Sequence, residues 1–122
     1  MSFIYLAAPY THEDPAIVAL RMQQVEEVTC MFFRSQTPVY SPLVSWHDLA
    51  LKYKLPNDYR AYRIQNLACI RACSELLVLD LTGWNNSLGV QWEIEEAQDR
   101  NIPVNLYHWN QTNQCIFKVR SL

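Results

Sequence analysis

One glutamate follows a turn whose residue types could support bond-breaking chemistry. The stretch GWNNSLGVQWEIEEA (83–97) runs from a polar turn into a helix whose second turn carries Glu93. Gly89 lies one turn before Glu93 on the same side and adds no side chain that would block a ligand. Asn86 or Ser87 is the expected N-cap, and the free N–H groups of the first turn could hold a hydroxyl or phosphate. This arrangement suits attack on an anomeric carbon, because N-glycosidic cleavage builds positive charge on the sugar.

The same pattern also fits an ordinary helix with a solvated outer face. Apolar residues predict a buried stripe, and Glu93 lies at its edge. The stripe consists of Val90, Ile94 and Ala97. In this alternative Glu93 joins Glu95 and Glu96 on the polar face, and Glu96 is spaced for an i,i+4 ion pair with Arg100. The pattern alone leaves both interpretations open.

Alternating strand and helix patterns must position these residues. Apolar runs at 3–8, 37–42, 75–81 and 102–109 predict strands, and helical patterns at 14–33, 57–73 and 86–101 separate them. The first helix is expected to begin with Asp14 as its N-cap and Pro15 as its first residue. Segment 43–56 fits either a short helix or an ordered loop, and 114–122 fits a final edge strand. We predict a single α/β domain (1–122) with a mainly parallel sheet of four to five strands between two helical layers.

Ligands of such sheets bind beyond the carboxyl ends of the strands. This rule selects the loops AAPYTH (7–12), YSPLVSWH (40–47) and DLTGWNNSLG (80–89). The candidate substrate-binding residues are Ala8, Pro9, Tyr10, Ser41, His47, Asp80, Ser87, Leu88 and Gly89. The sequence contains no G-x-G-x-x-G and no G-x-x-x-x-G-K-[ST], so it lacks the dinucleotide and P-loop fingerprints.

Histidine and tryptophan side chains surround the same loops. His12 and His47 could contact phosphate or act as an acid, because imidazole exchanges a proton near neutral pH; both also fit uninvolved loop residues. Trp46, Trp84 and Trp92 fall near the rim, and one of them could stack on a nucleobase. For Trp92, packing at a subunit interface or against the sheet is the alternative.

Composition limits the classes of partner. The 122 residues carry a formal net charge of −2, so neither nucleic acid nor a membrane is an expected partner. No apolar run approaches the roughly 20 residues of a membrane span, and MSFIYLAAPY lacks the features of a signal peptide. We therefore expect a cytoplasmic protein. Cys30, Cys69, Cys73 and Cys115 lack the partners of a metal site and are expected to be buried free thiols, and we predict no metal and no cofactor.

Several motifs, taken together, resemble a known superfamily. IYLAAPYTH, VYSPLVSWH, LACIRACSELLVLDLTGWNNSLGVQWEIEEA and IPVNLY occur in this order. They resemble the nucleoside 2-deoxyribosyltransferase-like superfamily, in particular a small branch with the patterns YLA-PY, SP and GW--S-GV--EI--A. The sequence is also similar to the 2′-deoxynucleoside 5′-monophosphate N-glycosidases, which share SLGV--E. The resemblance covers most of residues 3–106.

The resemblance implies a flavodoxin-like fold, usually in dimers whose active site borrows residues from a neighbouring subunit. Glu93 falls on the nucleophile that forms a covalent glycosyl-enzyme intermediate. Ser87 falls where the N-glycosidases bind the 5′-phosphate and where the transferases carry an aspartate for the sugar. Tyr5 matches a tyrosine near the nucleophile, and a place in the core is its equal alternative.

Two departures from the superfamily pattern affect the expected chemistry. Asn66 stands where the superfamily carries an aspartate that assists the leaving base and contacts the sugar, and an amide cannot deliver that proton. Either Asp58 or Asp80 replaces this acid, or the activity is slow, altered or lost; Asp80 also fits a turn-capping role.

The second departure concerns phosphate binding. Pro9 and Thr11 stand where the N-glycosidases use serine and arginine. Arg21, Arg60 or Arg63 could substitute, with a solvated surface charge as the alternative for each.

The resulting expectation is cleavage or transfer of the N-glycosidic bond of a small-molecule nucleoside or nucleotide. In that case Glu93, Asn66 and Tyr5 are the candidate catalytic residues, in a homodimer or higher homo-oligomer. Two alternatives remain open: a non-catalytic nucleotide-binding or sequestering protein that retains the pocket, and an enzyme acting on a different N-riboside.

Overall fold

A five-stranded sheet with the order β2-β1-β3-β4-β5 forms the centre of the structure, a computed structural model that describes residues 2–122. Its strands are β1 (Ile4–Ala7), β2 (Val39–Tyr40), β3 (Glu75–Leu79), β4 (Val104–Asn110) and β5 (Cys115–Ser121). The first four are parallel, and β5 pairs antiparallel with β4 at the edge. The predicted flavodoxin-like three-layer α/β fold is confirmed.

Four α-helices and two short 3₁₀ helices connect the strands. The α-helices are α1 (Pro15–Arg34), α2 (Pro42–Tyr53), α3 (Arg63–Ala72) and α4 (Leu88–Asp99), and the 3₁₀ helices are η1 (Tyr59–Tyr62) and η2 (Trp84–Asn86). Asp14 caps α1 as expected, because its carboxylate accepts the Ala16 N–H at 2.9 Å. The ambiguous segment 43–56 is mostly α2, which begins after Ser41. The helix predicted over 57–73 divides into η1 and α3.

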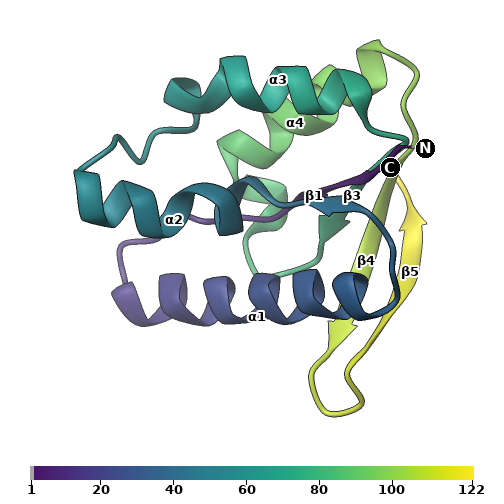
Figure 1. The fold of residues 1–122 in the computed structure, drawn as a ribbon, viewed down its shortest axis with the longest axis horizontal. Helices are drawn as coiled ribbons and strands as arrows, with labels where there is room; N and C mark the ends of the chain where they lie inside the picture. The colour runs from purple at the N-terminus through teal and green to yellow at the C-terminus, as the bar shows by residue number, and fades with distance from the viewer. Residues whose placement is uncertain (1) are drawn as a thin grey trace.

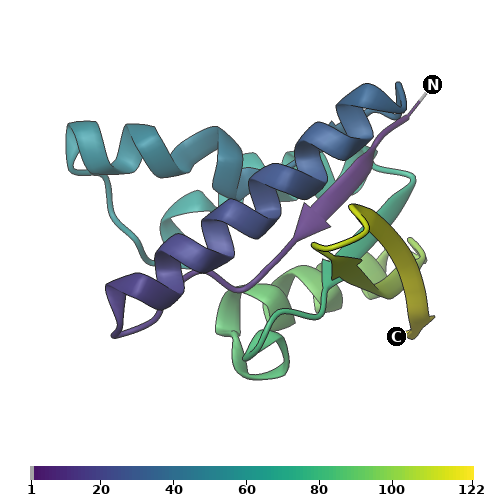
Figure 2. The same cartoon turned by 90° about the horizontal axis from the view of Figure 1, so that it is seen from below.

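Each face of the sheet has its own hydrophobic core, because neighbouring strand residues point to opposite sides. Tyr5 of β1 packs with Ile70 of α3 and Ile94 of α4 on one face. Leu6, the next residue, packs on the other face with Val28 of α1. Figure 1 shows α1 on one side of the sheet and α3 and α4 on the other, and Figure 2 places α1 in front of the strands.

The register of the parallel strands places all their carboxyl ends at the same end of the sheet. Ala7 of β1 lies opposite Val78 of β3, and Tyr5 lies opposite Tyr40 of β2. The loops after these strands, together with α2 and the first turn of α4, therefore surround one region of space. In Figure 1, α2 extends beyond this end of the sheet.

The cysteines agree only partly with the prediction of buried thiols. All four are free, but only Cys73 is buried, and Cys69 is half-buried. Cys30 and Cys115 are exposed, since Cys30 faces outward from α1 and Cys115 begins the edge strand β5. Among residues 2–122, no helix combines the length and apolar character needed to cross a membrane.

Candidate active site

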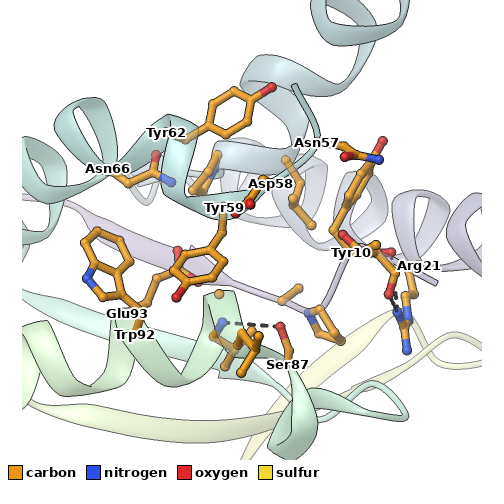
Figure 3. A pocket seen from close by; sticks show the side chains of 18 of the residues that line it. Tyr10, Arg21, Asn57, Asp58, Tyr59, Tyr62, Asn66, Ser87, Trp92 and Glu93 are labelled. Carbon is orange, nitrogen blue, oxygen red and sulfur yellow. Dashed lines mark hydrogen bonds between the residues drawn. The ribbon is translucent and has the colours of Figure 1, made fainter. Parts of the chain in front are cut away.

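A cavity of about 650 Å³ opens at the end of the sheet where the carboxyl ends of the parallel strands lie. Its walls come from the loop after β1, from α2, η1 and α3, and from the region between β3 and the second turn of α4 (Figure 3). A cavity of this size and of mixed aromatic and polar lining is typical of a small-molecule site.

Most of the candidate residues come together in this cavity. The cavity is lined by Ala8, Pro9, Tyr10, His47, Asn66, Ser87, Leu88, Gly89 and Glu93. Three candidates are not among the lining residues: Tyr5, Ser41 and Asp80. Tyr5 reaches the site indirectly through Glu93, whereas Ser41 and Asp80 have other partners.

Glu93 is buried at the cavity, with only 7% of its surface exposed. Loss of hydration on burial raises the pKa of its carboxyl to about 8, and the hydrogen bond from Tyr5 opposes this rise. The interpretation of Glu93 as part of a solvated polar face is therefore wrong. Glu95 is exposed as this interpretation expects, and the expected i,i+4 ion pair of Arg100 with Glu96 is present at 2.5 Å, with both side chains half-buried.

Tyr5 lies beneath Glu93 in the strand β1. Its side chain is fully buried, and its hydroxyl donates a hydrogen bond to Oε2 of Glu93. Burial raises the pKa of the Tyr5 hydroxyl, and the neighbouring Glu93 raises it further. Tyr5 is thus both a core residue and the group that holds one carboxyl oxygen of Glu93. Oε1 accepts no hydrogen bond from any side chain or backbone N–H of residues 2–122.

Ser87 and Gly89 position the beginning of α4. The Ser87 hydroxyl accepts the Val90 N–H at 3.3 Å, so Ser87 rather than Asn86 is the N-cap. Gly89 lines the cavity and has a further role in packing. A Cβ at this position would lie 3.1 Å from Cβ of Tyr59, so the glycine also allows η1 to pack closely against α4.

Asn66 occupies a buried position in the α3 wall of the cavity. It is 7% exposed, and its Oδ1 lies 3.4 Å from the Tyr40 hydroxyl that donates to it. Figure 3 shows Asn66 on the same side of the cavity as Tyr62 and Trp92. The side chain is therefore placed to contact a ligand through its amide.

Asp80 and Ser41 do not line the cavity, contrary to expectation. The Asp80 carboxylate contacts Nδ1 of His108, with both oxygens at 3.0 Å. Asp80 directly follows the last residue of β3, and its side chain points toward His108 of the neighbouring strand β4. Ser41 is buried and caps α2, where its hydroxyl accepts the Val44 N–H at 3.2 Å. Ser41 thereby orients α2, which carries His47.

Arg21 joins two of the loops that border the cavity. Its guanidinium is buried and donates to the carbonyl oxygens of Thr11 at 3.0 Å and Thr82 at 2.6 Å. Burial lowers the pKa of this guanidinium. Gly83 is required beside it, because a Cβ there would lie 2.8 Å from Nη2 of Arg21. Arg21 and Arg60 line the cavity, whereas Arg63 does not.

A pair of hydrogen-bonded side chains stands on another wall of the cavity. The Tyr10 hydroxyl lies 2.6 Å from Nδ1 of His47, and the two rings pack edge to face with centroids 5.4 Å apart. The nearby Trp46 also lines the cavity, and its buried indole N–H has no hydrogen-bond partner within residues 2–122. Trp92 lines the cavity as well and packs against Tyr59 with ring centroids 6.2 Å apart. Trp84 is not a lining residue.

The family model described as Domain of unknown function (DUF1937) matches residues 2–109. The chain belongs to this family. A comparison with curated proteins finds no match. The matched region of the DUF1937 domain contains all of the cavity-lining residues and ends within β4, before the edge strand β5.

Sequence reasoning missed one wall of this DUF1937 domain, the aromatic residues of η1. Tyr59 and Tyr62 line the cavity beside Asn57 and Asp58, which caps η1 by accepting the Arg60 N–H at 3.0 Å. The available signal was the cluster NDYRAYR (57–63), which places two tyrosines and two arginines directly at the expected N-cap of a helix. In the part of the chain that the structure describes, no three His, Cys, Asp or Glu side chains form a potential metal site.

Proposed function

We propose that the cavity binds a nucleoside or nucleoside 5′-monophosphate and that Glu93 cleaves or transfers its N-glycosidic bond. The observation that carries this proposal is the buried carboxyl of Glu93 at the cavity, with Tyr5 on one oxygen and no protein donor from residues 2–122 on the other. A carboxyl held in this way has one oxygen oriented for attack on a sugar carbon.

In the proposed reaction the ionised carboxylate attacks C1′ while the bond to the base breaks, and a glycosyl-enzyme ester forms. Water then attacks C1′ in a hydrolase, or a second base does so in a transferase. Burial serves the first step, since few water molecules need to leave the carboxylate before it attacks. The Tyr5 hydroxyl keeps its donor position through both steps and stabilises the carboxylate when it is released.

The pKa of about 8 makes the ionised form of Glu93 scarce at neutral pH in the empty cavity. Positive charge that develops on the sugar favours the ionised form, because opposite charges attract strongly where water is excluded. We therefore expect the step that needs the ionised carboxylate, the attack of Glu93 on C1′, to become faster as the pH rises toward 8.

The remaining lining suits the two other parts of a nucleotide. Aromatic faces for stacking on a base come from Trp46, Tyr59, Tyr62 and Trp92. For a 5′-phosphate, Arg21 and Arg60 are the cavity-lining cations. The first turn of α4, capped by Ser87, adds backbone N–H groups.

A base-release assay tests the proposal directly. Wild type and Glu93→Ala would be incubated with nucleosides, their 5′-monophosphates and nicotinamide nucleotides, and free base would be measured by chromatography. Half of the reactions would contain a second free base as an acceptor. We expect release by the wild type and a loss of at least a thousandfold in Glu93→Ala. Exchange into the acceptor would identify a transferase.

Intact-protein mass spectrometry provides a second readout of the covalent intermediate. A substrate with fluorine at C2′ of its sugar should add the mass of that sugar to the wild-type protein and not to Glu93→Ala. If no substrate released base while a nucleotide still raised the melting temperature, the enzyme proposal would be rejected. The alternative of a non-catalytic nucleotide-binding protein, with Asn66 in place of an acid, would then take its place.

A further inference from the structure

Cleavage of an N-glycosidic bond needs a proton donor as well as a nucleophile, because most nucleobases are poor leaving groups as anions. Neither of the expected acids fits. Asp80 is outside the cavity lining, in contact with His108. Asp58 lines the cavity, but the hydrogen bonds from Arg60 hold the pKa of its carboxyl at about 2, so it has no proton to give at neutral pH.

Two histidines remain among the lining residues, and they differ in their surroundings. His12 is exposed, and its Nδ1 accepts the Asp14 N–H at 2.9 Å at the beginning of α1. His47 is half-buried, and its Nδ1 lies 2.6 Å from the Tyr10 hydroxyl. Only His47 is therefore held by a second cavity-lining side chain, which leaves Nε2 as the nitrogen available to a ligand.

We propose that His47, oriented by Tyr10, is the general acid that protonates the leaving base. This inference rests on the proposed function of Glu93 and assigns the second half of the same reaction. A bound base would lie between the two groups in this arrangement, because Glu93 on α4 and His47 on α2 line the same cavity. Figure 3 shows Glu93 and Tyr10 on different sides of the cavity.

The proposed reaction starts from the hydrogen bond between His47 and Tyr10, and its protons and electron pairs can be followed from there. His47 begins as the imidazolium, with Nδ1–H donated to the Tyr10 oxygen. The Glu93 carboxylate forms a bond to C1′, the electron pair of the C1′–N bond goes to the base, and the Nε2 proton of His47 passes to the base. Water then attacks C1′ and gives its proton to Nε2, and the electron pair of the ester bond returns to the Glu93 carboxylate.

Tyr10 is a positioning residue in this scheme and remains neutral. Burial raises the pKa of its hydroxyl, so Tyr10 is a poorer acid than an ordinary tyrosine. The start of α2 fixes the position of His47, because Ser41 caps this helix and Pro42 is its first residue. The hydrogen bond and the edge-to-face packing then fix the direction of the ring.

The test compares leaving groups that share one sugar. Wild type, His47→Gln, Tyr10→Phe and His12→Gln would be assayed with an unsubstituted base, with halogenated and hence more acidic bases, and with nicotinamide, which leaves as a neutral molecule without a proton. We expect His47→Gln to lower kcat/KM by about a hundredfold or more for the unsubstituted base and by less than about tenfold for nicotinamide. Tyr10→Phe should show the same trend with a smaller loss.

His108→Gln is the matched control, since it removes a histidine outside the cavity and should leave every rate unchanged. Equal losses for all leaving groups in His47→Gln would overturn the inference and leave His47 a binding residue. The same selective loss in His12→Gln instead would also overturn it. If His47→Gln did not fold, the trend in Tyr10→Phe would decide the question.

The failure of this inference and that of the proposed function can be distinguished. A wild type that releases no base would reject both, and the role of Glu93 would be the cause. A wild type that releases base through Glu93, with no selective effect at His47, would reject the assignment of the acid alone.

Discussion

Glu93 and Asp58 both line the cavity, yet their surroundings shift the pKa of the two carboxyls in opposite directions. Burial raises the pKa of Glu93 to about 8, whereas hydrogen bonds from Arg60 lower the pKa of Asp58 to about 2. The Arg60 guanidinium lies within 2.7 Å of the Asp58 carboxylate, and both side chains are exposed to solvent.

The difference shows that the type of residue does not decide its chemical role. An exposed carboxylate that is already paired with arginine is ionised at all ordinary pH values and is screened by water and salt. A buried carboxyl with only a tyrosine donor has a protonation state that a ligand can change. Asp58 therefore contributes a fixed charge to the rim, and Glu93 is the candidate for chemistry.

The largest effect is expected from Glu93→Gln, measured as stability against pH. The folded protein favours the protonated carboxyl, so this stabilising contribution is complete below about pH 4.5 and is lost as the pH rises toward 8. The pKa difference corresponds to about 5 kcal/mol as an upper limit. Glu93→Gln should thus match the wild type at pH 4 and exceed its free energy of unfolding at pH 8, by urea denaturation.

Equal pH dependence of stability in the wild type and Glu93→Gln would contradict this contrast, because it would mean that Glu93 ionises normally in the folded protein. A gain in stability together with loss of base release is the combination expected of a functional carboxyl in a costly position.

A smaller effect is expected from Tyr5→Phe, which removes the hydrogen bond to Glu93. A buried acceptor without its donor should cost about 1–3 kcal/mol in free energy of unfolding. The pKa of Glu93 should rise further, because the opposing contribution of Tyr5 is gone. The pH at which base release becomes fast should therefore move upward in the pH–rate profile.

Tyr107→Phe is a suitable comparison for Tyr5→Phe. The Tyr107 hydroxyl lies 3.4 Å from the Glu75 carboxylate on a half-exposed part of the sheet. Its loss should cost less stability and leave the pH–rate profile in place. An unchanged profile in Tyr5→Phe as well would show that the Tyr5 hydrogen bond does not control the ionisation of Glu93.

The smallest effect is expected from Asp58→Asn. The amide oxygen can still cap η1, and an exposed ion pair contributes little to stability. Whatever stabilisation the pair provides is present above about pH 4 and is lost as the pH falls toward 2. The melting temperature between pH 5 and 9 should equal that of the wild type, and a clear decrease would show that the rim carboxylate matters as much as the buried one.

The fold could be predicted from the sequence because its signals are local. Apolar strand runs alternate with helical patterns, and caps such as Asp14 mark where helices begin. The helical pattern of 43–56 was ambiguous because α2 buries little apolar surface; Pro42 is the one residue of this helix that is buried. The division of 57–73 into η1 and α3 depends on packing against α4 at Gly89, a contact that no local pattern records.

The sequence by itself determined the alternation of strands with helices and the three segments that border the cavity. It also pointed to Glu93 through the turn and cap that precede it. Only the tertiary structure decided which carboxyl is buried, because burial depends on what η1 and β1 bring against α4. The same is true of the pairing of Asp80 with His108 and of Tyr10 with His47, since each pair joins segments far apart in the chain. Hydrogen bonds and desolvation act across these distances, and they set the protonation state on which the proposed chemistry depends.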